Sequence, residues 1–261
     1  MVLLPKEHGA YGQLAFPLVT ALAVSGASVP AGLIAVAIVG GFLAHEPLLV
    51  LLGMRGARVQ HEQRKFARIW LSALCVVGAC AAALAVASLP TSARWPLLVP
   101  AIPALPLAIA IVAGKEKTWP AEVGVSLVFS VAAFPVAMAA GATIPTAATV
   151  AAVFGLNFVL ATLGVRGVIL NIRGGGDPIA AASTRRAVLV LACVVPMIMV
   201  LASANALLPW TAPAATVPGV VTALWLAASP PPASRLRTLG WTLVTTSALT
   251  TVMLIAGLRS P

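Results

Sequence analysis

Residues 31–53 read AGLIAVAIVGGFLAHEPLLVLLG, an apolar run interrupted only by His45, Glu46 and Pro47. About 20 consecutive apolar residues are what an α-helix needs to cross the hydrocarbon core of a bilayer. The composition changes abruptly after this run, because Arg55 is the first of several closely spaced cations. The stretch therefore predicts a membrane-spanning helix that meets water near Arg55.

The same pattern extends over the whole chain of 261 residues. Hydrophobic residues make up 61% of the sequence and charged residues 8%, with a mean hydropathy of +1.05, whereas a soluble domain carries about 25% charged residues. The apolar runs do not alternate with polar positions, which favours helices over a β-barrel. We expect an all-α polytopic membrane protein, a single transmembrane domain over residues 1–261. Its nine predicted spans are 12–28, 31–53, 67–89, 95–113, 120–140, 145–170, 186–208, 212–228 and 238–257.

The positive charges fall on alternating connections between these spans. One set holds 14 of the 16 cations, and the other keeps Arg94 and Arg259. The 14 are Lys6, Arg55, Arg58, Arg64, Lys65, Arg68, Lys115, Lys117, Arg166, Arg173, Arg185, Arg186, Arg235 and Arg237. The positive-inside rule then predicts a cytoplasmic N-terminus and an external C-terminus. Retention at one membrane face accounts for the net charge of +10, so we expect no nucleic-acid partner.

Polar side chains at membrane depth are the first candidates for function. An ionised side chain there costs at least about 3 kcal/mol unless it faces a cavity or a partner. His45 and Glu46 meet this description and are candidate catalytic residues. Glu7 and His8 are two more, because residues 6–9 would form a polar lid over a cytoplasmic cavity. The alternatives are helix-to-helix hydrogen bonds for His45 and Glu46, and an interfacial helix cap for Glu7.

A stripe of polar residues near the end of span six is the second feature. Asn157, Gly164 and Asn171 are seven residues apart and share one face of a helix, with Arg166 and Arg173 beside it. Arginine is well suited to phosphate, although side chains that snorkel to lipid headgroups give the same pattern. Arg58 is also expected to pair with Glu62, four residues later. The candidate ligand-binding residues are Arg55, Arg58, Lys115, Glu122, Asn157, Arg166, Asn171 and Arg173.

Two segments carry a resemblance to a known family. PKEHGA at residues 5–10 and EPLL at residues 46–49 resemble the YwiC-like family of small bacterial membrane proteins. The resemblance implies a multi-pass protein of the bacterial cytoplasmic membrane. The nine-span topology, with its longest cytoplasmic connections after spans two and six, is in addition similar to the UbiA-type intramembrane prenyltransferases. That similarity implies a helical bundle whose site lies beneath those two connections.

The chain departs from the prenyltransferase pattern in its carboxylates. Those enzymes carry an Asp-rich motif after each of the two spans, because several carboxylates hold Mg²⁺ against a diphosphate. The first position here offers Glu46, and the second offers Asp177, the single Asp in the chain. We therefore expect no metal site and no cofactor, and Mg²⁺-dependent prenyl transfer is not predicted.

Two functions from different classes remain. The favoured one is binding of a lipid phosphate or isoprenoid at a cationic cavity facing the cytoplasm, with or without catalysis. The alternative is a small proton-coupled transporter or permease, since His and Glu within a membrane can relay protons. A third reading, an accessory subunit of a larger membrane complex, stays open.

Overall fold

The computed structural model describes residues 3–5, 8–115, 117–172 and 178–259. Within these ranges all regular structure is helical, which confirms the predicted all-α class. The α-helices are α1 (His8–Ser25), α2 (Val29–Leu51), α3 (Ala57–Ser88), α4 (Ala101–Val112), α5 (Trp119–Val131), α6 (Ala133–Ala139), α7 (Ile144–Ile172), α8 (Pro178–Ala204), α9 (Thr211–Ala228) and α10 (Leu236–Arg259). Three short 3₁₀-helices join them: η1 (Thr91–Ala93), η2 (Trp95–Leu98) and η3 (Ala233–Arg235).

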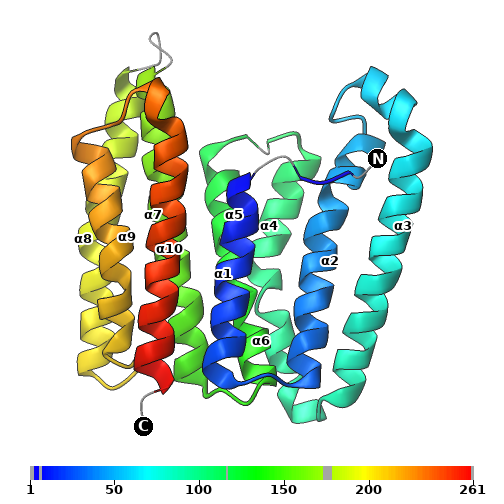
Figure 1. Cartoon of the computed structure of the whole chain (residues 1–261), viewed down its shortest axis with the longest axis horizontal. Coiled ribbons are helices and arrows are strands. Elements are labelled where there is room, and N and C mark those ends of the chain that lie inside the picture. The colour runs from blue at the N-terminus through cyan, green and yellow to red at the C-terminus, as the bar shows by residue number, and fades with distance from the viewer. Residues whose placement is uncertain (1–2, 6–7, 116, 173–177, 260–261) are drawn as a thin grey trace.

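The described chain contains nine helical segments of membrane type. Eight are long and apolar enough to cross a bilayer, and the ninth is a shorter apolar helix, Gly9–Ser25. The protein is thus a multi-pass membrane protein, as the sequence predicted. In Figure 1 the C-terminal ends of α2, α4, α7 and α9 lie at one end of the molecule, and α10 finishes at the other. The cytoplasmic location of the first of these ends stays a prediction from the charges.

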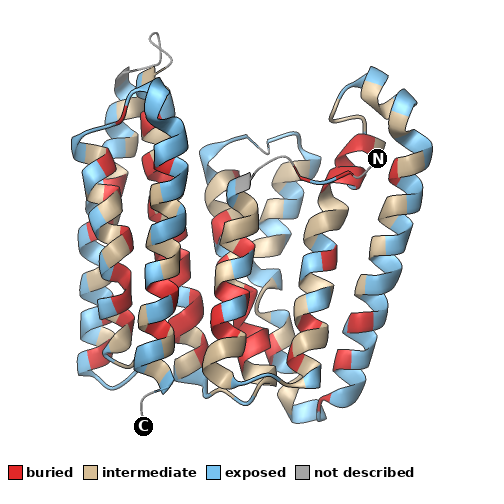
Figure 2. Cartoon of the chain, viewed as in Figure 1, coloured by how far each residue is buried: buried red, intermediate tan, exposed pale blue. Residues whose placement is uncertain are grey.

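Helix α7 forms the centre of the packing. It contacts α5, α6, α8 and α9 along its length, and α1 and α10 more briefly. Its Val150, Val153, Phe154 and Leu160 are fully buried. Inside the protein, 67% of the span in α7 is buried but only 11% of the span in α3, and Figure 2 shows α3 exposed along most of its length. The core therefore surrounds α7, while α3 lies at the edge against α2.

The first turns of α3 correct one predicted boundary. The sequence places span three at 67–89, but the helix already begins at Ala57. Its early residues are mostly Gln, Glu, Arg and Lys, which have high helix propensity once the chain leaves the bilayer. Val59 and Phe66 pack against a buried cluster that includes Val50 of α2, which gives this extension an apolar contact. The cations from Arg58 onward consequently stand on a helix and not in a loop.

Prolines and helix ends shift other boundaries. Predicted span five is two helices, because Pro135 has no N–H to donate to the carbonyl of Val131, where α5 ends. Predicted span seven, 186–208, is instead Pro178–Ala204. Arg185 and Arg186, expected in a connection, therefore lie on α8.

Candidate functional site

Glu46 is buried near the C-terminal end of α2 and is paired with Arg55. Its side chain is 4% exposed, against 30% for Arg55. The Nε of Arg55 donates to Oε1 of Glu46 at 3.0 Å, and Nη2 donates to Oε2 at 2.6 Å. This two-point geometry is the strong form of a carboxylate–guanidinium contact. The carboxylate that the sequence marked as needing a partner is thus held by the first cation after its own helix.

The end of α2 explains how Arg55 reaches back. Gly53 has a φ of 76°, and its N–H donates to the carbonyl of Val50, while the N–H of Met54 donates to that of Leu49. This pair of bonds is the Schellman motif, which favours glycine because it requires the left-handed conformation. The Gln60 side chain also donates to the carbonyl of Leu51 at 2.7 Å. The helix end is therefore closed, and the chain reverses toward Glu46 within a few residues.

A cavity of about 350 Å³ adjoins this ion pair. It lies among α1, α2, α4 and α5, and most of its wall is apolar. The lining residues are Pro5, Ala10, Ile38, Gly41, Phe42, His45, Glu46, Arg55, Pro100, Leu107, Ile111, Val125, Val128, Phe129 and Ala132. We call this space the Glu46 cavity. Among the described residues, His45, Glu46 and Arg55 supply its charged or ionisable side chains, so one region is polar and the rest of this lining suits a hydrocarbon.

Aromatic rings and the N-terminal segment border the same cavity. The ring of Phe42 packs edge-on against Tyr11 and against Phe129, with centroids 5.1 and 5.4 Å apart. The Tyr11 hydroxyl donates to the carbonyl of Pro5 at 3.0 Å, and Leu3 is buried against α2 and α3. Residues 3–5 are therefore fastened beside the cavity. The sequence analysis missed these aromatic residues, and the only signal for Tyr11 was that it is the single Tyr of the chain.

The predicted lid residues are only partly covered by the structure. Glu7 lies outside the described residues. His8 begins α1, and its side chain is likewise outside what the structure describes. The lid therefore stays a prediction, although Pro5 and Ala10 on either side of these positions both line the Glu46 cavity.

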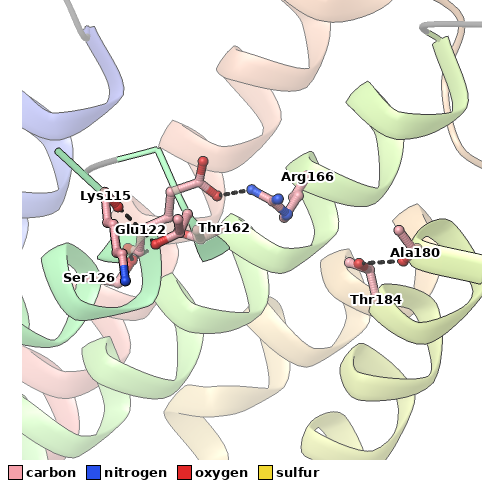
Figure 3. Close-up of polar contacts among 8 residues, drawn as sticks. Lys115, Glu122, Ser126, Thr162, Arg166, Ala180 and Thr184 are labelled. Atoms are coloured by element: carbon pink, nitrogen blue, oxygen red, sulfur yellow. Dashed lines mark hydrogen bonds and ion pairs between the residues drawn. The ribbon is translucent and has the colours of Figure 1, made fainter. Parts of the chain in front are cut away.

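A second ion pair joins α5 to α7 and is shown in Figure 3. Nη1 of Arg166 donates to Oε2 of Glu122 at 2.9 Å, and the two side chains are 29% and 36% exposed. One turn along α5, the Ser126 hydroxyl lies 2.8 Å from that of Thr162. Arg166 is thus directed toward α5 and away from Thr184 of α8. This pair lies apart from the Glu46 cavity, whose lining does not include it.

The remaining cationic candidates are found in different surroundings. Arg58 donates to Glu62 at 2.8 Å on the exposed part of α3, which confirms the predicted pair. Lys115 follows α4 and is exposed. Arg173 lies outside the described residues. Of the predicted cations, the Glu46 cavity is lined by Arg55 and not by Arg58, Lys115 or Arg166.

The stripe on α7 faces α9. A Cβ at Gly219 of α9 would overlap the amide of Asn157, and a Cβ at Gly164 would lie 3.0 Å from Leu226 of α9. Asn157 is buried and donates to Thr250 of α10 at 3.0 Å. Asn171 is exposed at the far end of α7, where it lines a different cavity. Asn157 and Gly164 therefore share a helix face toward α9, in agreement with their seven-residue spacing.

The acidic residues do not fit a magnesium centre in the part of the chain that the structure describes. Each of the three glutamates there, Glu46, Glu62 and Glu122, is bonded to an arginine. Among the described residues no group of three or more His, Cys, Asp and Glu side chains could hold a metal ion. Mg²⁺ needs carboxylates free to coordinate it or its phosphate ligand, and these carboxylates are engaged by guanidinium groups instead.

Comparison with known proteins gives one match. Residues 4–138 match the family described as YwiC-like protein. No curated protein and no solved structure matches the chain. The matched segment covers α1 to α6 and includes every residue that lines the Glu46 cavity. Because it spans just over half of the 261 residues, this protein belongs to the YwiC-like family.

Proposed function

We propose that this protein binds a lipid phosphate with an isoprenoid or similar apolar chain in the Glu46 cavity, within the cytoplasmic membrane of a bacterium. The observation that carries the proposal is the division of the cavity into a polar region at Glu46 and Arg55 and an apolar remainder. An amphiphile with one charged group and one chain has the same division. The proposal needs no metal ion, in keeping with the pairing of Glu46 to arginine.

The shape of the cavity supports an extended chain. Its lining includes Pro100, directly before α4, and Ile111, in the last turn of α4. These two positions are separated by about 16 Å of helix rise. A volume of about 350 Å³ lies at the lower end of the range for ligand pockets. A space of this volume with lining residues at both ends of α4 suits a short isoprenyl chain or the first part of a longer one.

Arg55 is the proposed contact for the phosphate. A guanidinium group presents five N–H donors in a planar fork that matches phosphate oxygens. Glu46 receives the bonds from Nε and Nη2 and so fixes the plane of the fork. Glu46 would then act as a positioning residue, holding Arg55 at the cavity, while His45 lies beside it on the same wall.

The test is binding of a labelled isoprenyl phosphate to the purified protein in nanodiscs, with Mg²⁺ and again with EDTA. Arg55→Ala is compared with Arg58→Ala, which removes an equal charge from an exposed position three residues away. We expect Arg55→Ala to weaken binding at least about tenfold, the value of one charge-assisted hydrogen bond. Arg58→Ala should leave the affinity unchanged, and so should EDTA.

A control for folding completes this experiment, because Arg55→Ala leaves Glu46 buried without its partner. Glu46→Gln/Arg55→Gln removes both charges together and should lose binding while remaining folded by thermal unfolding. Equal affinity for the wild type and this double variant would contradict the proposal. Proton or substrate flux in proteoliposomes would instead support the proton-coupled transporter, which half-buried His45 and buried Glu46 also suit.

A further inference from the structure

A second cavity, of about 520 Å³, lies among α7, α8 and α9. It belongs to the part of the chain beyond residues 4–138, and it shares no lining residue with the Glu46 cavity. The lining residues are Leu163, Gly164, Gly167, Asn171, Ala181, Ala182, Thr184, Arg185, Arg186, Val188, Leu189, Leu226, Ala227, Ala228 and Pro230. We call it the α8 cavity. Its lining residues lie toward the C-terminal ends of α7 and α9, and these helix ends are at the molecular end predicted to face the cytoplasm (Figure 1).

Small residues create the hollow. Gly164 already lies against Leu226, since an added Cβ there would come within 3.0 Å of that side chain. Gly167 faces α8, where an added Cβ would meet Thr184 at 3.8 Å. With alanines on α8 and α9 completing much of the wall, the three helices enclose space that larger side chains would fill. The inner wall at Leu163, Val188 and Leu226 is apolar.

The rim of the α8 cavity is cationic. Arg185 and Arg186 stand in adjacent positions on α8, and both are exposed. The glutamates that the structure describes are bonded to Arg55, Arg58 and Arg166, so none of them neutralises these two arginines. Among the described residues no carboxylate lines the cavity. The charge of these lining residues therefore favours an anion.

Two polar side chains, Asn171 and Thr184, line the cavity together with the arginines. The Asn171 amide on α7 can donate to an anion. The Thr184 hydroxyl donates to the carbonyl of Ala180 at 2.8 Å (Figure 3) and lines the cavity beside Arg185. Arg166, which the sequence placed beside the polar stripe of α7 that ends at Asn171, points instead toward Glu122. Of the residues that the structure describes, Arg185 and Arg186 of α8 are the cations that line the cavity.

We infer that the α8 cavity binds a phosphate group, with Arg185 and Arg186 as its principal contacts. Guanidinium groups match phosphate oxygens in geometry. Basic pockets between transmembrane helices at the cytoplasmic face hold anionic lipid headgroups, and the apolar inner wall would accommodate part of an acyl chain. Free inorganic phosphate presents the same oxygens to the arginines. A lipid would in addition contact the apolar inner wall with its acyl chain, whereas inorganic phosphate would not.

In the experiment, the protein is placed in phosphatidylcholine nanodiscs that contain phosphatidic acid and is then purified from them. The amount of phosphatidic acid that stays bound to the protein is measured. Arg185→Ala/Arg186→Ala is compared with Arg64→Ala/Lys65→Ala, which removes two adjacent exposed cations from α3. We expect the α8 variant to lose about tenfold or more in affinity and the α3 variant to behave like the wild type. A second arm titrates inorganic phosphate into protein in pure phosphatidylcholine.

Two further variants separate the site from general surface charge and from misfolding. Arg185→Lys/Arg186→Lys keeps both charges and should retain partial binding. Gly167→Leu should impair retention of the lipid but not of inorganic phosphate, because it fills the hollow and leaves the rim intact. Equal losses in the α8 and α3 alanine variants would overturn the inference, as would an absence of binding in both arms. Variants at Arg55 should not change this binding. That result would distinguish phosphate binding in the α8 cavity from ligand binding in the Glu46 cavity.

Discussion

Arg55 and Glu46 form a two-point ion pair, with N···O distances of 3.0 and 2.6 Å between residues nine positions apart. The contact crosses the Schellman turn at Gly53 and places a guanidinium group against a carboxylate that is 4% exposed. Removing one member of a buried pair leaves the other charge without compensation, whereas removing both avoids that penalty.

The first prediction concerns the stability of this pair. Glu46→Gln and Arg55→Gln should each lower the free energy of unfolding by about 3 kcal/mol, and the double variant should lose much less than the sum. Unfolding in detergent, followed by helical circular dichroism, measures all four proteins of the cycle. Additive losses would show that the two side chains act independently.

The second prediction concerns the pair between α5 and α7. Glu122 and Arg166 are each about one-third exposed, so solvent screens their attraction. Glu122→Gln should therefore cost less than about 1 kcal/mol in the same unfolding assay. A loss as large as that of Glu46→Gln would mean that the pair is more deeply desolvated in the membrane than its exposure indicates.

The sequence predicted the helices better than their ends. Runs of apolar residues identified all nine segments, because the bilayer imposes its thickness on any helix that crosses it. Several predicted boundaries were wrong, among them the start of α3, the start of α8 and the undivided span five. Ala57 begins α3 early because polar residues of high helix propensity continue the helix. Pro135 divides one predicted span into α5 and α6.

The polar residues His45, Glu46 and Arg55 of the Glu46 cavity were named from the sequence, but its aromatic residues and its contacts were not. Glu46 was identified by the cost of a charge at membrane depth. Its partner was not, because the pairing depends on the turn at Gly53 and not on a helical spacing. Similarly, the α7 stripe was visible as a seven-residue repeat. The direction of Arg166 toward Glu122 was not, since it depends on how α5 packs against α7.

The third prediction concerns the contact between α7 and α9. A Cβ at Gly219 would overlap the amide group and approach the Cβ of Asn157, so rotation of the amide cannot relieve the clash. Gly219→Ala should cost about 1–3 kcal/mol. Asn157→Ala should suppress most of that loss when combined with it, as measured by thermal unfolding. Full destabilisation in the double variant would indicate a clash with another group.

The fourth prediction concerns orientation. Most cations lie on or beside the helix ends that the charge pattern assigns to the cytoplasm, and α10 ends at the opposite side of the molecule. Alkaline phosphatase fused to the C-terminus should therefore be active in a bacterial host, and green fluorescent protein at that position should not fluoresce. The reverse result would invert the topology and move the polar region of the Glu46 cavity to the outer face.

The fifth prediction tests the apolar part of the Glu46 cavity without changing any charge. Gly41 of α2 lines the cavity, and an added Cβ would meet no atom within 4 Å. Gly41→Leu should fold, because leucine is a good helix former, and should place its side chain where the lipid chain would lie. Binding of the labelled isoprenyl phosphate should fall at least about tenfold, the scale of a steric mismatch in an apolar pocket.

Gly32→Leu is the matched control for this variant, since Gly32 is also on α2 with open space at its Cβ but does not line the cavity. It should bind like the wild type. Arg55→Ala tests the phosphate contact, and the comparison of Gly41→Leu with Gly32→Leu tests the place of the apolar chain. Loss at Arg55 with no loss at Gly41 would mean that the phosphate binds while the chain lies elsewhere, against the lipid. Loss in Gly41→Leu and Gly32→Leu alike would reflect damage to α2, and the cavity would then not be the site of the chain.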